Sequence, residues 1–97
     1  MMYCDFCKAP NPKQEFPCGD FRMPPEEPEH WSRGAWMACD FCAELVASDQ
    51  RFELATRSIE TYANMTGSVL DPSEYEELLA VITEGHRRFF ENRILDG

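Results

Sequence analysis

The second half of the chain has apolar side chains at helical spacing. Residues on one face of an α-helix recur every three or four positions. The first stretch with this spacing contains Phe52, Ala55, Ile59 and Tyr62. Ser48 or Asp49 is suited to cap its start, and Gly67 is a typical residue at a helix end. The pattern therefore predicts a helix that ends at Gly67.

A further helix is predicted to begin at Asp71. Asp71 is a favourable N-cap, Pro72 suits the first helical position, and Glu74 completes a helix-start signature. The apolar positions that follow are Tyr75, Leu78, Leu79, Ile82, His86, Phe89 and Phe90. They predict one broad apolar face. Gly85 interrupts this helix at a cost of about 1 kcal/mol relative to alanine.

The first half contains only short apolar segments, separated by prolines and glycines. Phe16 and Phe21 flank a Gly-Asp turn and predict a short β-hairpin. The segment 23–30 is rich in proline, which removes backbone donors, so we expect an exposed acidic loop there. The residues after Cys42 favour a helix.

Five cysteines in 97 residues indicate that a metal or disulfides stabilise a small core. Four of them lie in two copies of the tetrapeptide CDFC. The N-terminus does not resemble a signal peptide and the number of cysteines is odd, so we expect a cytoplasmic protein with reduced thiols. Two CxxC pairs match a closed tetrahedral site that holds zinc at about 2.3 Å. The predicted ligands of one structural Zn²⁺ are Cys4, Cys7, Cys39 and Cys42.

Other interpretations of the cysteines stay open. They could be ordinary buried thiols, or one pair could be a redox dithiol, although a doubled CxxC favours zinc over both. Cys18 could be a further ligand or a reactive thiol. Because four cysteines already complete the site, we expect Cys18 to be a small buried apolar residue.

These patterns predict one α+β domain over residues 1–97. Residues 1–47 contain all five cysteines and form the expected zinc module, with two CxxC knuckles, a short β-hairpin and a helix. Residues 48–97 form a helical part with two C-terminal α-helices.

The chain is acidic, with a formal net charge of −9. Such a charge repels phosphate backbones and disfavours nucleic-acid binding, although zinc modules of this size are often assumed to bind nucleic acid. A local basic patch at Arg87, Arg88 and Arg93 keeps a nucleic-acid-binding zinc protein as a third alternative. No stretch approaches the roughly 20 apolar residues that span a bilayer, so no membrane association is expected.

The two CDFC motifs, with Cys42 leading into AELVAS, resemble the treble-clef and zinc-ribbon group. More narrowly, FPCGDF and WMACDFCAEL look like small uncharacterised zinc-binding proteins of actinobacteria and their phages. Rubredoxin is also similar in its two CxxC pairs, which implies an iron electron carrier as the main alternative. Rubredoxin-type knuckles place glycine after the second cysteine, whereas Lys8 and Ala43 occupy these positions here.

No pattern typical of nucleophilic catalysis or phosphate binding occurs, so we expect no enzymatic activity and no catalytic residues. The predicted function is a zinc-stabilised protein-interaction module, an adaptor or inhibitor of another protein. The expected partner-binding residues are Glu26, Glu27, Glu29 and Trp31 in the acidic loop, and Phe89 and Phe90 at the end of the last helix. An uncovered apolar end of this helix would form a partner surface or the seam of a homodimer.

Overall fold

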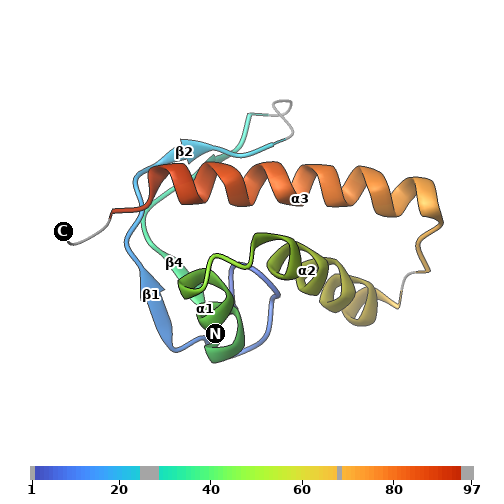
Figure 1. Cartoon of the computed structure of the whole chain (residues 1–97), viewed down its shortest axis with the longest axis horizontal. Helices are drawn as coiled ribbons and strands as arrows, with labels where there is room; N and C mark the ends of the chain where they lie inside the picture. Colours follow the sequence, from blue (N-terminus) through green and yellow to red (C-terminus); the bar gives the residue numbers. More distant parts are fainter. Residues whose placement is uncertain (1, 25–28, 68, 95–97) are drawn as a thin grey trace.

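The structure is a computed structural model that describes residues 2–24, 29–67 and 69–94. Within these ranges, four short strands come first: β1 (Gln14–Phe16), β2 (Phe21–Arg22), β3 (Trp31–Ser32) and β4 (Trp36–Ala38). Three helices follow: α1 (Asp40–Ala47), α2 (Arg51–Thr66) and α3 (Pro72–Asn92). Figure 1 shows α3 along the length of the molecule, with the strands near its C-terminal end. The predicted α+β class is confirmed.

The strands form two separate antiparallel pairs. β1 pairs with β4, with Phe16 opposite Trp36, and β2 pairs with β3. The predicted hairpin between Phe16 and Phe21 is therefore wrong, because these residues belong to different sheets. The segment between them binds the end of α3 instead, where the Ile94 N–H donates to the Pro17 carbonyl at 2.9 Å.

The helix expected after Cys42 is α1, and it begins slightly earlier because Cys39 is its N-cap. Ser48 ends this helix, since its N–H and hydroxyl both donate to the Glu44 carbonyl. Neither Ser48 nor Asp49 therefore caps α2, whose N-cap is Gln50.

The end of α2 and the start of α3 agree with prediction. Gly67 closes α2 in the left-handed conformation, with φ 66°. The Asp71 side chain accepts a hydrogen bond from the Glu74 N–H at 2.8 Å, with Pro72 in the first turn. Gly85 lies where the chain after β2 crosses α3, because a Cβ there would be 3.1 Å from the Met23 methyl group.

The buried face of α2 differs in part from the predicted one. Ala55 and Ile59 are buried as expected. Leu54 is also buried, so the buried face is turned about the helix axis relative to the predicted face. Phe52 and Tyr62 are 72% and 46% exposed.

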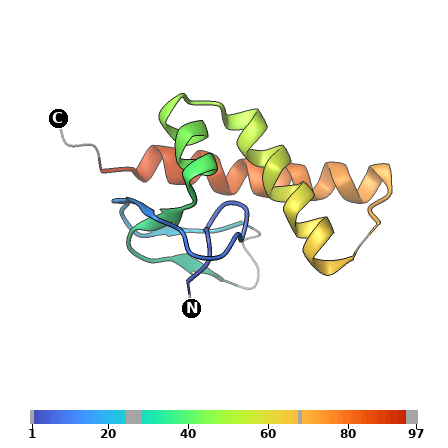
Figure 2. The same ribbon diagram turned by 90° about the horizontal axis from the view of Figure 1, so that it is seen from below.

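One hydrophobic core joins the two halves of the chain. Phe6 of the first CDFC motif, Trp36 of β4 and Phe89 of α3 pack together, with ring centroids 4.9 to 5.2 Å apart. Figure 2 shows the strands packed beneath the C-terminal half of α3, while α2 crosses that helix and runs away from it. Among the described helices, none is long and apolar enough to cross a membrane.

Candidate metal centre

The four cysteines of the two CDFC motifs converge at one point. Their sulfur atoms all lie within 4.8 Å of one another, and the Sγ atoms of Cys7 and Cys39 are 3.6 Å apart. Four thiolates around one zinc ion at about 2.3 Å would be separated by roughly 3.8 Å. A disulfide requires about 2.05 Å, so these are free thiols, and they lie close enough together to hold one ion. Cys4, Cys7 and Cys42 are fully buried.

The first pair is held by a tight turn. The Cys7 N–H points at the Cys4 sulfur at 3.4 Å, and the Lys8 N–H donates to the Cys4 carbonyl at 2.9 Å. Lys8 has a φ of 65°, the left-handed conformation that favours glycine. Lys8 therefore adopts a glycine-like conformation at the position after the second cysteine.

The second pair is held by a helix start. Cys39 is the N-cap of α1, and its sulfur accepts a hydrogen bond from the Cys42 N–H at 3.5 Å. The positive end of the helix dipole lies at this terminus and favours thiolates. Local backbone donors thus stabilise negative sulfur in both motifs.

Asp5 ties the two motifs together. Its carboxylate accepts from the Met37 N–H at 2.6 Å, and its own N–H donates to the Met37 carbonyl at 2.8 Å. Met37 lies in β4, which leads directly to Cys39. The first turn is therefore fixed against the strand that delivers the second pair.

Arg57 of α2 supplies positive charge beside the sulfurs. Burial lowers the pKa of Arg57, but interaction with Cys42 and Cys39 raises it by more, so its pKa lies above the ordinary value. Its guanidinium carbon also lies 4.2 Å from the centre of the Phe41 ring. A cation in this position offsets part of the charge of four thiolates. No short sequence motif predicts this contact, because Arg57 lies in α2, a different helix from the one that contains the second cysteine pair.

The protonation of the thiols reflects how closely they are packed. A hydrogen bond from Cys42 lowers the pKa of Cys4 to about 4, and the same bond raises the pKa of Cys42. Burial raises the pKa of Cys7. Four such sulfurs become thiolates together only when a cation compensates their charge. The cluster could hold one metal ion, and soft sulfur ligands suit zinc or iron.

Cys18 lies outside the cluster. It is 5% exposed, its sulfur is oriented toward the Phe89 carbonyl at 3.8 Å, and burial raises the pKa of its thiol. Its expected burial is confirmed.

The predicted partner-binding residues are separated in the structure. Glu26 and Glu27 lie outside the described residues. Trp31 is 41% exposed and its indole N–H donates to Glu29, so these two form a surface pair. Phe89 is fully buried in the core, because Phe6, Trp36 and the turn after β1 cover this part of α3. It is therefore not exposed for a partner, in contrast to the expectation from sequence.

Phe90 is half-buried, and the Arg51 guanidinium carbon lies 4.1 Å from its ring centre. Two of the three arginines of the predicted basic patch form ion pairs, and the third, Arg93, lies over the Phe16 ring, with its guanidinium carbon 5.1 Å from the ring centre. Arg87 pairs with Glu84 and Glu91, and Arg88 pairs with Glu84. Positive charge on this face of α3 is therefore largely compensated.

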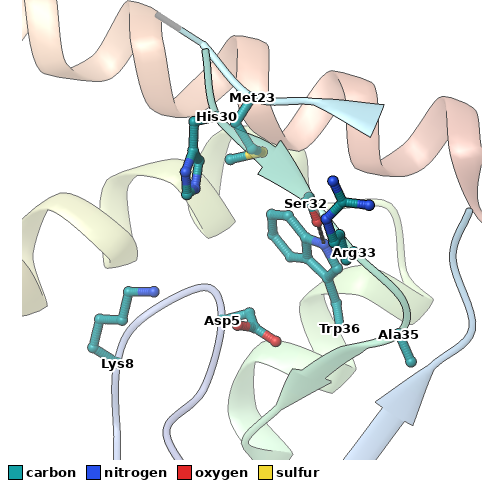
Figure 3. Close-up of a pocket in the computed structure, with 8 residues that line it drawn as sticks. All are labelled: Asp5, Lys8, Met23, His30, Ser32, Arg33, Ala35 and Trp36. Carbon is teal, nitrogen blue, oxygen red and sulfur yellow. Dashed lines mark hydrogen bonds between the residues drawn. The ribbon is translucent and has the colours of Figure 1, made fainter. Parts of the chain in front are cut away.

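A polar depression of about 260 Å³ lies beside the first motif (Figure 3). Lys8 and His30 approach it from opposite sides, while Arg33 points away. The Asp5 carboxylate is bonded to Met37, and the Ser32 hydroxyl accepts from the Trp36 indole at 2.7 Å. Within the described ranges neither group is hydrogen-bonded to the His30 side chain, so the depression has no assembled nucleophile and base.

Comparison of the chain with protein-family models, curated proteins and solved structures found no match. The resemblance to treble-clef proteins and to actinobacterial and phage proteins therefore depends only on the short sequence segments that carry it, which are the two CDFC motifs, AELVAS, FPCGDF and WMACDFCAEL.

Proposed function

We propose that this chain is a non-enzymatic protein-interaction module of the cytoplasm, held together by one structural zinc ion in a treble-clef-like arrangement. The observation that carries the proposal is the closed set of four cysteines, three of them fully buried. A tetrahedral ion with four protein ligands has no open position for a substrate. Its role is then to stabilise surfaces that bind another protein, as an adaptor or an inhibitor.

The treble-clef-like assignment is supported by the order of the parts. A cysteine turn comes first, an antiparallel strand pair β1–β4 follows, and the second cysteine pair lies at the start of α1. The polar depression beside Lys8 also favours a binding role over catalysis, because its Asp5 and Ser32 side chains are occupied by structural hydrogen bonds.

An iron electron carrier of the rubredoxin type is the second candidate. The left-handed conformation of Lys8 favours it, since rubredoxin-type knuckles have glycine at this position. The second motif differs, because Ala43 lies within a helix. Only the first CDFC motif is therefore followed by a residue in the left-handed conformation, as expected for a rubredoxin-type knuckle.

Metal analysis of protein produced without added metal separates these candidates. The interaction module should contain one zinc per chain and be colourless, whereas a ferric centre would absorb strongly in the visible range. Zinc-loaded protein should then retain a specific partner from an extract of the organism that encodes it, and Cys39→Ser protein should not. Stoichiometric iron, or equal retention by both forms, would overturn the proposal.

A further inference from the structure

An apolar cleft lies between α2 and α3, and its deep end reaches the first CDFC motif, where Asp5, Phe6 and Lys8 line it. Its deep part has a volume of about 250 Å³ and adjoins an outer part of about 340 Å³. Tyr62, Leu78 and Val81 line both parts. Figures 1 and 2 show that α2 diverges from α3 toward the connection between them. Side chains of both helices line the outer part of the cleft, which leaves room that a third element could fill.

The walls of this cleft are apolar side chains that the fold leaves partly uncovered. Tyr62 and Val81 are 46% and 38% exposed, and Leu78 and Ile82 are half-buried. Covering such side chains removes apolar surface from water, which is favourable. The deep part is smaller than the roughly 300–1,000 Å³ typical of sites for drug-sized ligands. It suits one inserted side chain better than a cofactor.

His86 forms part of the deep end. Its side chain is 6% exposed, and its Nδ1 atom is buried without a hydrogen-bond partner among the described residues. Burial lowers the pKa of His86 to about 4, so the imidazole is neutral at physiological pH. His86 therefore adds no positive charge to the deep end of the cleft. An apolar occupant suits this neutral interior.

The outer rim is acidic. Glu74 and Glu77 line it, and in the described part of the chain neither forms an ion pair with a basic side chain. Lys8 and Asp5, at the deep end, offset each other in charge. A second copy of the chain would bring the same carboxylates and a further net charge of −9. Charge complementarity therefore favours a basic occupant.

We propose that the cleft between α2 and α3 binds a basic amphipathic helix of the partner protein, with one bulky apolar side chain inserted beside Tyr62 and Val81. Lysine or arginine side chains of that helix would lie against Glu74 and Glu77. This is the helix-in-groove mode, in which apolar anchors provide affinity and rim charges provide orientation. The inference rests on the proposed interaction function and names the surface that performs it.

A model peptide tests the cleft directly. The probe is an amidated 14-residue peptide with the sequence LKKLLKL repeated twice, and the control is a scrambled peptide of the same composition without an apolar face. Trp31→Phe protein leaves Trp36, which lines the deep part, as the only tryptophan whose fluorescence reports binding. Saturable one-to-one binding of the probe is expected, with binding of the scrambled peptide at least about tenfold weaker.

Two glutamate substitutions separate insertion from simple charge attraction. Val81→Glu, in the cleft, should weaken probe binding about tenfold or more, although it makes the protein more acidic. Phe52→Glu makes the same change in charge at an exposed site on α2 outside the cleft, and should leave binding within about twofold. Attraction by charge alone would instead strengthen binding in both variants.

A charge-neutralising pair provides a test without a change in the apolar wall. The double variant Glu74→Gln and Glu77→Gln should weaken binding more than Glu53→Gln with Glu60→Gln, which removes the same charge on the other side of α2. Equal effects, equal binding of the scrambled peptide, no saturable binding, or a homodimer that Val81→Glu dissociates would overturn the cleft proposal. A natural partner that zinc-loaded Val81→Glu protein still binds normally would overturn the cleft but leave the interaction function intact.

Discussion

The two CDFC motifs have identical residues but different surroundings. Phe6 of the first motif is 3% exposed and contacts the rings of Trp36, His86 and Phe89. Phe41 of the second is 57% exposed and packs against the Arg57 guanidinium. One phenylalanine therefore belongs to the core, and the other lies on the surface above a cation.

The aspartates of the motifs differ in the same way. Asp5 binds the backbone of Met37 in β4, whereas Asp40 lies in the first turn of α1, where its charge complements the helix dipole. The tetrapeptide thus specifies the spacing of two sulfurs. What its central residues do depends on whether a turn or a helix follows the first cysteine.

The largest expected effect concerns the cysteines, for which the two motifs should behave alike. Cys7→Ser and Cys39→Ser should each abolish stoichiometric metal binding and unfold the first half of the chain, because structural zinc contributes about 10–16 kcal/mol at pH 7. Elemental analysis and circular dichroism would measure both effects.

Cys18→Ala is the matched control for these variants. It should keep one metal per chain and cost only about 1 kcal/mol, because Cys18 is a small buried residue outside the cluster. Loss of metal in Cys18→Ala as severe as in Cys39→Ser would show that the ligand set is wrong.

A second effect should separate the two motifs sharply. Phe6→Ala removes a buried ring from the core and should cost about 3–5 kcal/mol. Phe41→Ala removes an exposed ring and one cation–π contact, so the cost should stay below about 1 kcal/mol. Urea unfolding of the metal-loaded proteins gives both free energies. Similar values would mean that the two knuckles are equivalent.

The features that could be predicted from sequence are those set by neighbouring residues. The four cysteines that could hold a metal ion follow from the two CxxC pairs, and the start of α3 follows from Asp71, Pro72 and Glu74. Such signals act within one turn of the chain, so distant contacts do not alter them.

The features that could not be predicted depend on residues far apart in sequence. β1 pairs with β4 and not with β2, which is nearer in the chain. Phe89 has the same apolar spacing as the rest of the α3 face, and its contacts with Phe6 and Trp36 distinguish it as core. Arg57 lies beside the cysteines because α1 and α2 pack together, which no local pattern encodes.

The smallest expected difference lies between the two aspartates. Asp5→Ala leaves the Met37 N–H without its acceptor and should cost about 1–3 kcal/mol. Asp40→Ala removes only a favourable charge at a helix start, worth about 0.3–1 kcal/mol. Urea unfolding gives the two free energies, and amide exchange at Met37 should accelerate only in Asp5→Ala. If Asp40→Ala proved the more destabilising, the first turn would not be fixed through β4, and the two cysteine pairs would be brought together chiefly by the metal itself.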